Sequence, residues 1–368
     1  MRIPLIKPFI DEYTKKKVLE VLDSGHLTEG SVTGEFESVC RDYIGCKYVI
    51  AVSSCTVGLE MALRCLNIGP GDEVIVPDYT YPATADVVAI VGAKIVLVDV
   101  NPETMLINYD ALESAIGPQT KAFIPVSLFG NPLDYMRLEA VKEKYGINIV
   151  EDTAGALGAE YLGKRVGTQA DISVFSLHPR KFITTGEGGL ITTNDDNWAS
   201  WLTSYKKFGL RPSDQAQGNA FAMIGSNFKL SDVLGAIGLG QMQRINELLS
   251  RRKELAENYI RLLNGVEGIR MPGITKGGTH SYQSFCIFVE KRDDILEDLR
   301  LNGIEVQIGT YSLHKELAFS DSSLCELRGG MAGSDYVYGH CLTLPLYHSM
   351  SEKDQEEVVN AIIHNLEG

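Results

Sequence analysis

The chain has 368 residues, of which 44% are hydrophobic and 22% charged, so it can bury a large core and exceeds the usual size of one domain. Its formal net charge of −14 argues against general nucleic-acid binding, which needs a basic surface. No N-terminal segment has the layout of a signal peptide, and no uninterrupted apolar run approaches the length of a membrane span. Seven cysteines without a CxxC pair are typical of reduced thiols. We therefore expect a cytoplasmic protein with no metal site and no nucleic-acid or membrane partner.

Short apolar runs alternate with helical stretches through the first half of the chain, a pattern that predicts an α/β fold with a mostly parallel sheet. The expected elements, in chain order, are a helix over 11–24, a strand from Tyr48, a helix over 59–66, strands over 73–77 and 94–98 around a helix from Pro82, and strands over 121–126, 147–152 and from Ile172.

The pattern changes after a long polar and glycine-bearing loop over residues 204–225. Ser231 is a good N-cap for a long helix or helix pair that ends near Asn264-Gly265 and bridges two domains. A strand over 284–290, a helix over 292–303 and a strand over 304–308 follow. We predict a large domain over residues 1–240 and a small C-terminal α+β domain over residues 241–368.

The central segment, residues 171–190, reads DISVFSLHPRKFITTGEGGL. It begins as a strand, turns at His178-Pro179, presents Arg180-Lys181 and returns through glycines into another strand. A lysine in this position can hold an amine against a ligand, and burial there would lower its pKa, so that the neutral amine becomes accessible. An exposed loop lysine beside a glycine turn would show the same spacing.

Two further segments place polar groups at the ends of predicted strands. Residues 53–56 lead a strand into a helix, an arrangement that binds anions at the helix N-terminus or simply caps the helix. Asp152 ends a buried strand, where a carboxylate needs a positive partner unless it caps the next helix. Tyr79 and Tyr81 follow another strand, at the edge where open α/β sheets bind ligands, although an aromatic residue there can also serve packing alone.

Nucleotide-binding motifs give no competing interpretation. Residues 158–164 read GxxxxGK, but Arg165 stands where Ser or Thr should hold magnesium. No GxGxxG string occurs, which disfavours a dinucleotide-binding dehydrogenase.

The segment around Lys181, the Glu151-Asp152 turn and the Gly225–Lys229 motif, in this order, closely resemble the DegT/DnrJ/EryC1/StrS sugar aminotransferases. The resemblance runs from IPLIKP near the start to the final helix. It implies a pyridoxal-phosphate (PLP) transferase of fold type I, with a large mostly parallel sheet domain and a smaller C-terminal α+β domain. Members of this family move an amino group from an amino acid, usually L-glutamate, to a ketone on a nucleotide-linked sugar.

The resemblance also implies roles for single residues. Lys181 would carry the cofactor as an internal Schiff base and move the proton, Asp152 would hold the pyridine nitrogen, and Tyr81 would pack on the ring. His178 would line the substrate pocket beside Lys181. The residues matched to the cofactor phosphate are Ser54, Cys55, Thr56, Ser176 and Asn227, the last acting in the neighbouring subunit of a homodimer. Those matched to the substrate are Arg180, Lys229, Tyr311 and His314, with Arg211 adding positive charge.

Two departures and several alternatives accompany this resemblance. Ser54 and Cys55 replace the Asn and Gly of the usual S-N-G-T phosphate segment, and Gly155 stands where Gln or Glu usually lies near the ring hydroxyl. The ITTGEGG string after Lys181 favours amination at C4 of a 4-keto-6-deoxy sugar. A C3 keto-sugar, a sugar phosphate or a cyclitol stay open as substrates. A sugar dehydratase, which has His in place of the lysine, and a non-catalytic homologue are the remaining alternatives.

Overall fold

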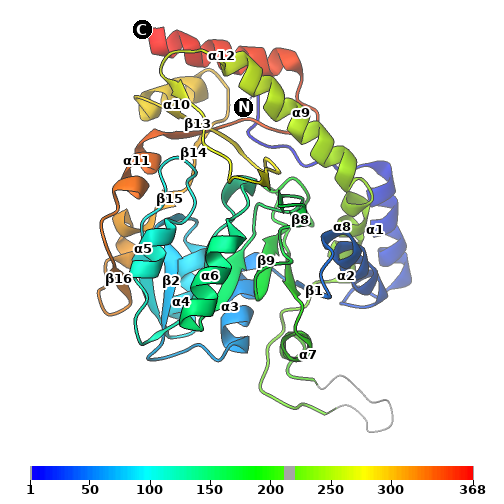
Figure 1. Ribbon diagram of the computed structural model, residues 1–368. Coiled ribbons are helices and arrows are strands. Elements are labelled where there is room, and N and C mark those ends of the chain that lie inside the picture. Colours follow the sequence, from blue (N-terminus) through cyan, green and yellow to red (C-terminus); the bar gives the residue numbers. More distant parts are fainter. Residues whose placement is uncertain (1, 211–219, 368) are drawn as a thin grey trace.

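An eight-stranded sheet lies at the centre of the protein, in a computed structural model that describes residues 2–210 and 220–367 (Figure 1). The strand order is β1-β10-β9-β6-β5-β2-β4-β16, and β10 runs antiparallel to both neighbours while all other pairs are parallel. The strands are β1 (Tyr48–Val52), β2 (Glu73–Pro77), β4 (Lys94–Val98), β5 (Thr120–Phe123), β6 (Asn148–Asp152), β9 (Ile172–Ser176), β10 (Gly189–Thr193) and β16 (Cys325–Leu327). Most of their residues are buried, as expected of a sheet covered on both faces.

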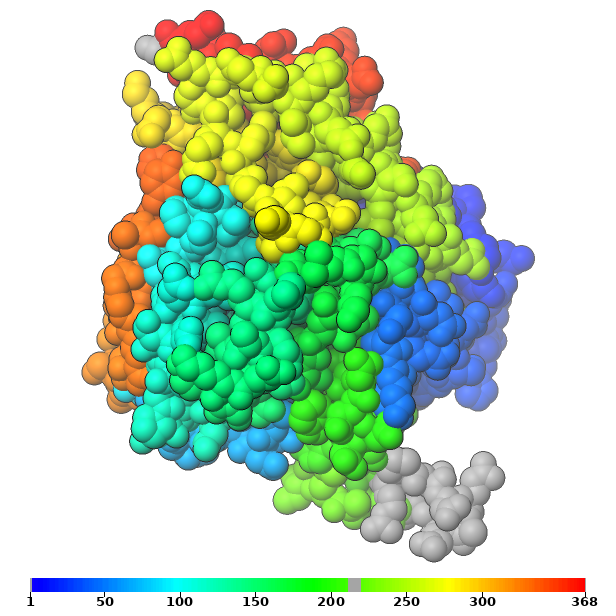
Figure 2. Space-filling model, viewed as in Figure 1, coloured from blue at the N-terminus to red at the C-terminus, as the bar shows by residue number. Residues whose placement is uncertain are grey.

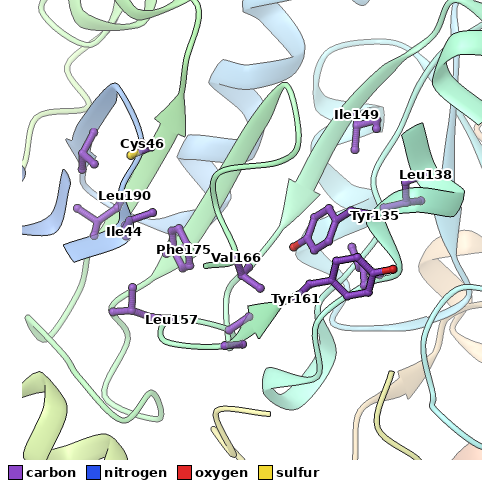
Figure 3. Packing of buried hydrophobic residues seen from close by; sticks show 14 of the residues in the cluster. Ile44, Cys46, Tyr135, Leu138, Ile149, Leu157, Tyr161, Val166, Phe175 and Leu190 are labelled. Carbon is purple, nitrogen blue, oxygen red and sulfur yellow. The ribbon is translucent and has the colours of Figure 1, made fainter. Parts of the chain in front are cut away.

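Helices cover each face of this sheet and form two apolar cores. One core contains residues of α3 (Cys55–Cys65), α4 (Ala83–Ile90) and α7 (Asp196–Tyr205). The other contains residues of α2 (Ser31–Ile44), α5 (Tyr109–Ser114), α6 (Tyr135–Tyr145) and α8 (Asp232–Met242), and α1 (Glu12–Ser24) packs on α8. Figure 3 shows part of this second core, where the rings of Tyr135 and Tyr161 lie with their centroids 5.6 Å apart. Burial of these two apolar layers is the main stabilising contribution to the fold.

A smaller antiparallel sheet, in the order β11-β13-β17-β14, lies beyond one end of the large one (Figure 1). Residues coloured yellow to red make up the upper part of the molecule in Figure 2. The strands of the smaller sheet are β11 (Ile269–Arg270), β13 (Phe285–Val289), β14 (Gln307–Ile308) and β17 (Cys341–Leu344). A third apolar cluster joins it to α9 (Ile245–Leu263), α10 (Arg292–Leu301) and α12 (Glu352–Glu367). The remaining helix and strands are α11 (Ala332–His340), β3 (Tyr79–Thr80), β7 (Glu160–Tyr161), β8 (Lys164–Arg165), β12 (Gly278–Thr279) and β15 (Tyr311–Ser312).

Most elements agree with the sequence pattern, and the differences have local causes. α3 begins at Cys55 rather than Leu59 because the Ser54 hydroxyl caps it, accepting the Val57 N–H at 3.2 Å. β5 ends at Phe123 rather than at residue 126, ahead of Pro125, which has no N–H to donate. Only the last two residues of the predicted strand 304–308 form β14, because Ile304 pairs with Ile3 at the start of the chain.

The long predicted helix is a pair, α8 and α9, with Ser231 capping α8 as expected. α9 reaches from the large sheet to the third apolar cluster, while β16 returns from the C-terminal segment to the large sheet. The boundary at residue 240 stays a prediction. Within residues 2–210 and 220–367, we find no helix whose length and apolar character would let it cross a bilayer.

Candidate active site

A cavity of about 570 Å³ lies at the carboxyl ends of the parallel strands, where open α/β sheets bind ligands. Loops after β1, β2, β6 and β9 form its floor, and residues from α9 and the small sheet form the opposite wall. The sequence-predicted residues that line it are Ser54, Cys55, Thr56, Tyr81, Asp152, Ser176, His178, Arg180 and Lys181. Residues up to 127 positions apart in the chain are therefore brought to one site.

Asp152 is the last residue of β6, and its side chain is 5% exposed. It accepts hydrogen bonds from the Thr84 hydroxyl at 2.8 Å and from the Ala154 N–H at 3.0 Å. Burial raises the pKa of this carboxyl, and these two bonds and the charge of Lys181 oppose the rise. No Lys, Arg or His of the described residues forms a salt bridge with Asp152, so its carboxylate can still pair with a cationic group of a ligand.

Lys181 lies in the turn that follows β9, where its backbone N–H donates to the His178 carbonyl at 2.8 Å. Its side chain reaches the cavity that Asp152 also lines. Burial lowers the pKa of the Lys181 ammonium, while the nearby Cys55 and Asp152 partly restore it. The site therefore favours the neutral amine more than water does, as nucleophilic lysine chemistry requires.

The N-terminus of α3 faces the same cavity through Ser54, Cys55 and Thr56. Gly189 at the start of β10 permits this approach, because a Cβ atom there would lie 2.7 Å from the Ser54 carbonyl carbon. The Cys55 Sγ is 3.6 Å from the Val174 carbonyl, and burial raises the pKa of this thiol well above its usual value, so the thiol stays protonated. The Cys55 and Thr56 N–H groups, which have no hydrogen-bond acceptor among the described residues, and the Thr56 side chain suit an anionic group.

A short network orders the turn that carries Lys181. The His178 N–H donates to the Ser176 hydroxyl at 3.3 Å, and the Arg180 N–H donates to His178 Nδ1 at 3.2 Å. Burial lowers the pKa of His178, which keeps the imidazole neutral and able to accept that bond. Arg180 Nη1 donates to the Gln307 amide oxygen at 3.2 Å, which ties the turn to β14 of the small sheet.

Tyr81 stands at the open side of the cavity with 65% of its surface exposed. The ring of Tyr311 lies edge-on to it, with centroids 6.3 Å apart, because β3 and β15 pair at Thr80 and Tyr311. Tyr311 itself does not line the cavity. Tyr81 can therefore present a ring face to a flat ligand.

The other predicted residues lie outside the cavity lining of their own chain. Lys229 Nζ donates to the Asn227 amide oxygen and lies 4.7 Å from the centroid of the Phe208 ring. His314 Nδ1 lies 2.6 Å from a carboxylate oxygen of the fully buried Asp78, so its ring is held by the protein. Arg211 lies outside the described residues.

Three lining or supporting residues have no counterpart in the sequence interpretation. Thr84 holds Asp152, Gln283 lies against Gly155, and Arg252 lies on the wall formed by α9. A Cβ atom at Gly155 would be 2.9 Å from the Gln283 amide oxygen, so Gln283 occupies the space where the family motif usually places Gln or Glu. The i+4 spacing of Thr84 from Thr80 was visible in the sequence, but no motif marks Gln283 or Arg252.

The polar groups of the cavity fit PLP. The buried carboxylate of Asp152 matches a protonated pyridine nitrogen, and the start of α3 matches a phosphate. Lys181 supplies an amine of lowered pKa to the same cavity. The cavity has room for a flat ring against Tyr81 and for a substrate beside that ring.

Comparison with known proteins gives a consistent result. The model of the DegT/DnrJ/EryC1/StrS aminotransferase family matches residues 8–363. The chain is similar to the GDP-perosamine synthase of Caulobacter vibrioides, with 34% identity over 98% of this chain and 97% of that protein. Among solved structures, it is similar to the putative sugar aminotransferase Spr1654 from Streptococcus pneumoniae in its PMP-form, with a TM-score of 0.93, 29% identity and 99% of each chain covered.

A second solved structure, the sugar aminotransferase CalS13 from Micromonospora echinospora, has a TM-score of 0.91 and 30% identity over 98% of this chain and 99% of that chain. Spr1654 is also known in a PLP-form, which agrees with the cofactor predicted for this chain. The predicted fold, enzyme class and family resemblance are confirmed by these comparisons. The chain belongs to the DegT/DnrJ/EryC1/StrS aminotransferase family.

Proposed function

We propose that this protein uses PLP to move the amino group of an amino acid, L-glutamate, to the C4 ketone of a 4-keto-6-deoxy nucleotide sugar. The observation that carries the proposal is the convergence of Lys181, Asp152 and the start of α3 on one cavity. The name of the Caulobacter relative, a GDP-perosamine synthase, supports a nucleotide-linked sugar as the acceptor. PLP, when bound, would supply the electron sink and the amino-group carrier that this transfer needs.

In this proposal each group of the site has one task. The neutral amine of Lys181 would hold the cofactor and, once released by the donor, would accept and return the proton that moves during the transfer. The Asp152 carboxylate, positioned by Thr84, keeps the pyridine nitrogen protonated. The helix N-terminus at Ser54 and Thr56 binds the phosphate, with Ser176 beside it, and Tyr81 packs on the ring.

The turn after Lys181 supports the choice of C4. Glu187 and Gly188 of the ITTGEGG string line the cavity, so this turn shapes the space beside the reacting amine. Arg180, also at the cavity, supplies positive charge for a diphosphate on a protein of net charge −14.

We also propose a homodimer with shared active sites. Asn227 and Lys229 do not line the cavity of their own chain, and the same segment exposes Phe221 by 70% and Ile224 by 96%. Exposed apolar side chains of this size favour burial against a partner. In the dimer, Asn227 would reach the phosphate and Lys229 the nucleotide in the neighbouring site, with Tyr311 and His314 also near the substrate. The large and small domains would divide at residue 240, with α9 as the bridge.

The proposal is tested by incubating the protein with PLP, L-glutamate and a panel of nucleotide keto-sugars, with keto-sugar phosphates and cyclitol ketones included. Mass spectrometry identifies the acceptor that gains the amine, and NMR of the product locates the nitrogen. We expect a 4-amino-4,6-dideoxy nucleotide sugar. Nitrogen on C3, or turnover only with a ketone that lacks a nucleotide, would overturn the C4 assignment; no transfer to any acceptor would overturn the function.

A further inference from the structure

Arg252 is a buried guanidinium on the wall of the cavity, with 7% of its surface exposed. It lies on α9, and its hydrogen bonds within the described part of the chain all go to backbone carbonyls, while its guanidinium carbon lies 5.8 Å from the centroid of the Phe182 ring. Nε donates to the Tyr282 carbonyl, and Nη2 donates to the carbonyls of Gln283 at 2.6 Å and Leu346 at 3.2 Å. These bonds hold the guanidinium in one orientation.

No carboxylate of the described residues pairs with Arg252, although the other two buried basic residues in this part of the chain, Lys206 and Arg292, each have one. The buried Lys206 lies 3.0 Å from both Glu29 and Glu37, and the buried Arg292 pairs with Asp293 at 2.6 Å. Burial without a counter-charge lowers the pKa of Arg252 to about 9. A buried charge that lacks a partner is costly, and such a cost is retained where a ligand supplies the partner.

The remaining nitrogen of Arg252 gives the direction in which a ligand would bind. Nη1 makes no hydrogen bond to any residue in 2–210 or 220–367, yet it is not among the fully enclosed side-chain atoms that lack a partner. The two spaces that Arg252 borders are the main cavity and a small pocket beside Phe182, and Lys181 borders both. Nη1 therefore faces space shared with the reactive amine.

Asp152, Lys181 and Arg180 of the cavity already have roles in the proposed function. Glu187, which also lines the cavity, is acidic and would repel a carboxylate. Asp152 faces the ring nitrogen, the start of α3 faces the phosphate, and Arg180 is bonded to Gln307 on the exposed side. The amino acid that donates its nitrogen must bring its α-carbon to Lys181, and an α-carboxylate is bonded to that carbon. We propose that Arg252 binds the α-carboxylate of the amino donor, an inference that rests on the proposed function.

The test measures donor binding rather than turnover. PLP-loaded protein is titrated with α-methyl-L-glutamate, which has no α-hydrogen and so cannot complete the transfer, and the dissociation constant is read from the cofactor's visible absorbance. A charge-assisted bond of ordinary strength corresponds to roughly a tenfold to hundredfold change in affinity. We expect R252Q to weaken binding by at least tenfold, and R252K, which keeps the charge but loses the planar contact, to lie between R252Q and the unmodified protein.

R251Q is the matched control. Arg251 precedes Arg252 on α9 and also donates to backbone carbonyls, at His348 and Met350, but it pairs with Glu254 at 2.8 Å and does not line the main cavity. R251Q should bind α-methyl-L-glutamate with the same affinity as the unmodified protein. Circular dichroism and cofactor absorbance establish that each variant is folded and loaded.

A second arm needs no variant, so it decides the matter if R252Q does not fold. The unmodified protein is titrated with two donor analogues that cannot complete the transfer, α-methyl-L-glutamate and 4-amino-4-methylpentanoate. The second carries a methyl group in place of the α-carboxylate, and we expect it to bind at least tenfold more weakly. Equal binding of these two analogues, or equal affinity of folded R252Q and the unmodified protein, overturns the inference. Either result leaves the proposed function standing if amino transfer to a keto-sugar is observed, whereas absence of all transfer refutes the function itself.

Discussion

Gln283 and Gly155, 128 positions apart in the chain, share one space beside the cavity: a Cβ atom on Gly155 would lie 2.9 Å from Gln283 Oε1 and 3.5 Å from its Cβ. The Gln283 amide is held there by a bond from Nε2 to the Arg180 carbonyl at 3.1 Å. Gly155 thus leaves room for the Gln283 amide, besides departing from the family motif.

This relationship predicts non-additive stability. Gly155→Ala should cost about 1 kcal/mol of unfolding free energy, because the methyl group displaces the Gln283 amide and its hydrogen bond. The same substitution in a Gln283→Ala background should cost little or nothing. Urea unfolding of the four proteins measures the coupling. An equal cost in both backgrounds would show that Gln283 is not what restricts residue 155.

Lys181 is expected to be the point of cofactor attachment. The purified protein should be yellow, and borohydride reduction followed by proteolysis should leave the cofactor mass on the peptide that contains Lys181. Lys181→Ala should abolish the reducible adduct, while Lys229→Ala, outside the cavity of its own chain, should retain it. A reducible adduct on another lysine in Lys181→Ala would contradict the assignment.

Asp152→Asn should retain the fold and lose most turnover. The amide keeps the shape of the side chain but removes the charge that holds the ring proton, a contribution on the order of 1.5–3 kcal/mol. Thr84→Val removes only the hydroxyl that positions this carboxylate and should cause a smaller loss. Steady-state rates with matched cofactor loading compare the three proteins. Near-normal turnover in Asp152→Asn is the outcome inconsistent with the role.

We predict that Glu151, which lies next to Asp152 but on the opposite side of β6, makes the stability of the folded protein depend on pH. It is fully buried and accepts bonds from Ser127 and Tyr135 at 2.6 Å and from Ser173 at 3.1 Å, yet burial raises its pKa to about 7. A carboxyl whose pKa is higher in the folded state than in the unfolded state holds its proton more tightly when the protein is folded. Its contribution to stability therefore falls as pH rises from about 4.5 to about 7.

Ionisation of Glu151 should lower the unfolding free energy of the unmodified protein by an amount on the order of 2–3 kcal/mol across that interval, and Glu151→Gln should not show this loss. The measurement is the difference in unfolding free energy between variant and unmodified protein at pH 4.5, 6 and 7.5. The difference should shift in favour of the variant as pH rises. A difference that does not change with pH would mean that Glu151 titrates normally.

The shared active site predicts complementation between two inactive chains. Lys181→Ala lacks the attachment point, and Asn227→Ala lacks a group that acts in the neighbouring subunit. Mixed and refolded together, they should form hybrid dimers in which one site has both residues, so that some activity returns. If hybrids form and Asn227→Ala is inactive alone, recovery of no activity would assign Asn227 to the site of its own chain.

Local sequence determined much of this protein. Strands such as Glu73–Pro77 and Lys94–Val98 follow from apolar runs between turn residues, and the caps at Asp11, Ser54 and Ser231 follow from short side chains that accept backbone N–H groups. Lys181 and Asp152 were also visible, because each follows or ends a strand in a distinctive string, and parallel strands bring their carboxyl ends to one edge.

Only the tertiary structure decided which distant residues complete the site. Arg252 and Gln283 reach the cavity because the small sheet packs over the large one. His314, which also follows a predicted strand, is oriented by the buried Asp78, 236 positions earlier. Such contacts depend on how distant elements pack against each other. Neither the spacing of residues nor the secondary-structure propensity of a segment predicts them. Local sequence thus determined the residues at the strand ends, where the cofactor is expected to bind. The opposite wall of the cavity is built from contacts between segments far apart in the chain, so only the fold decided which residues form it.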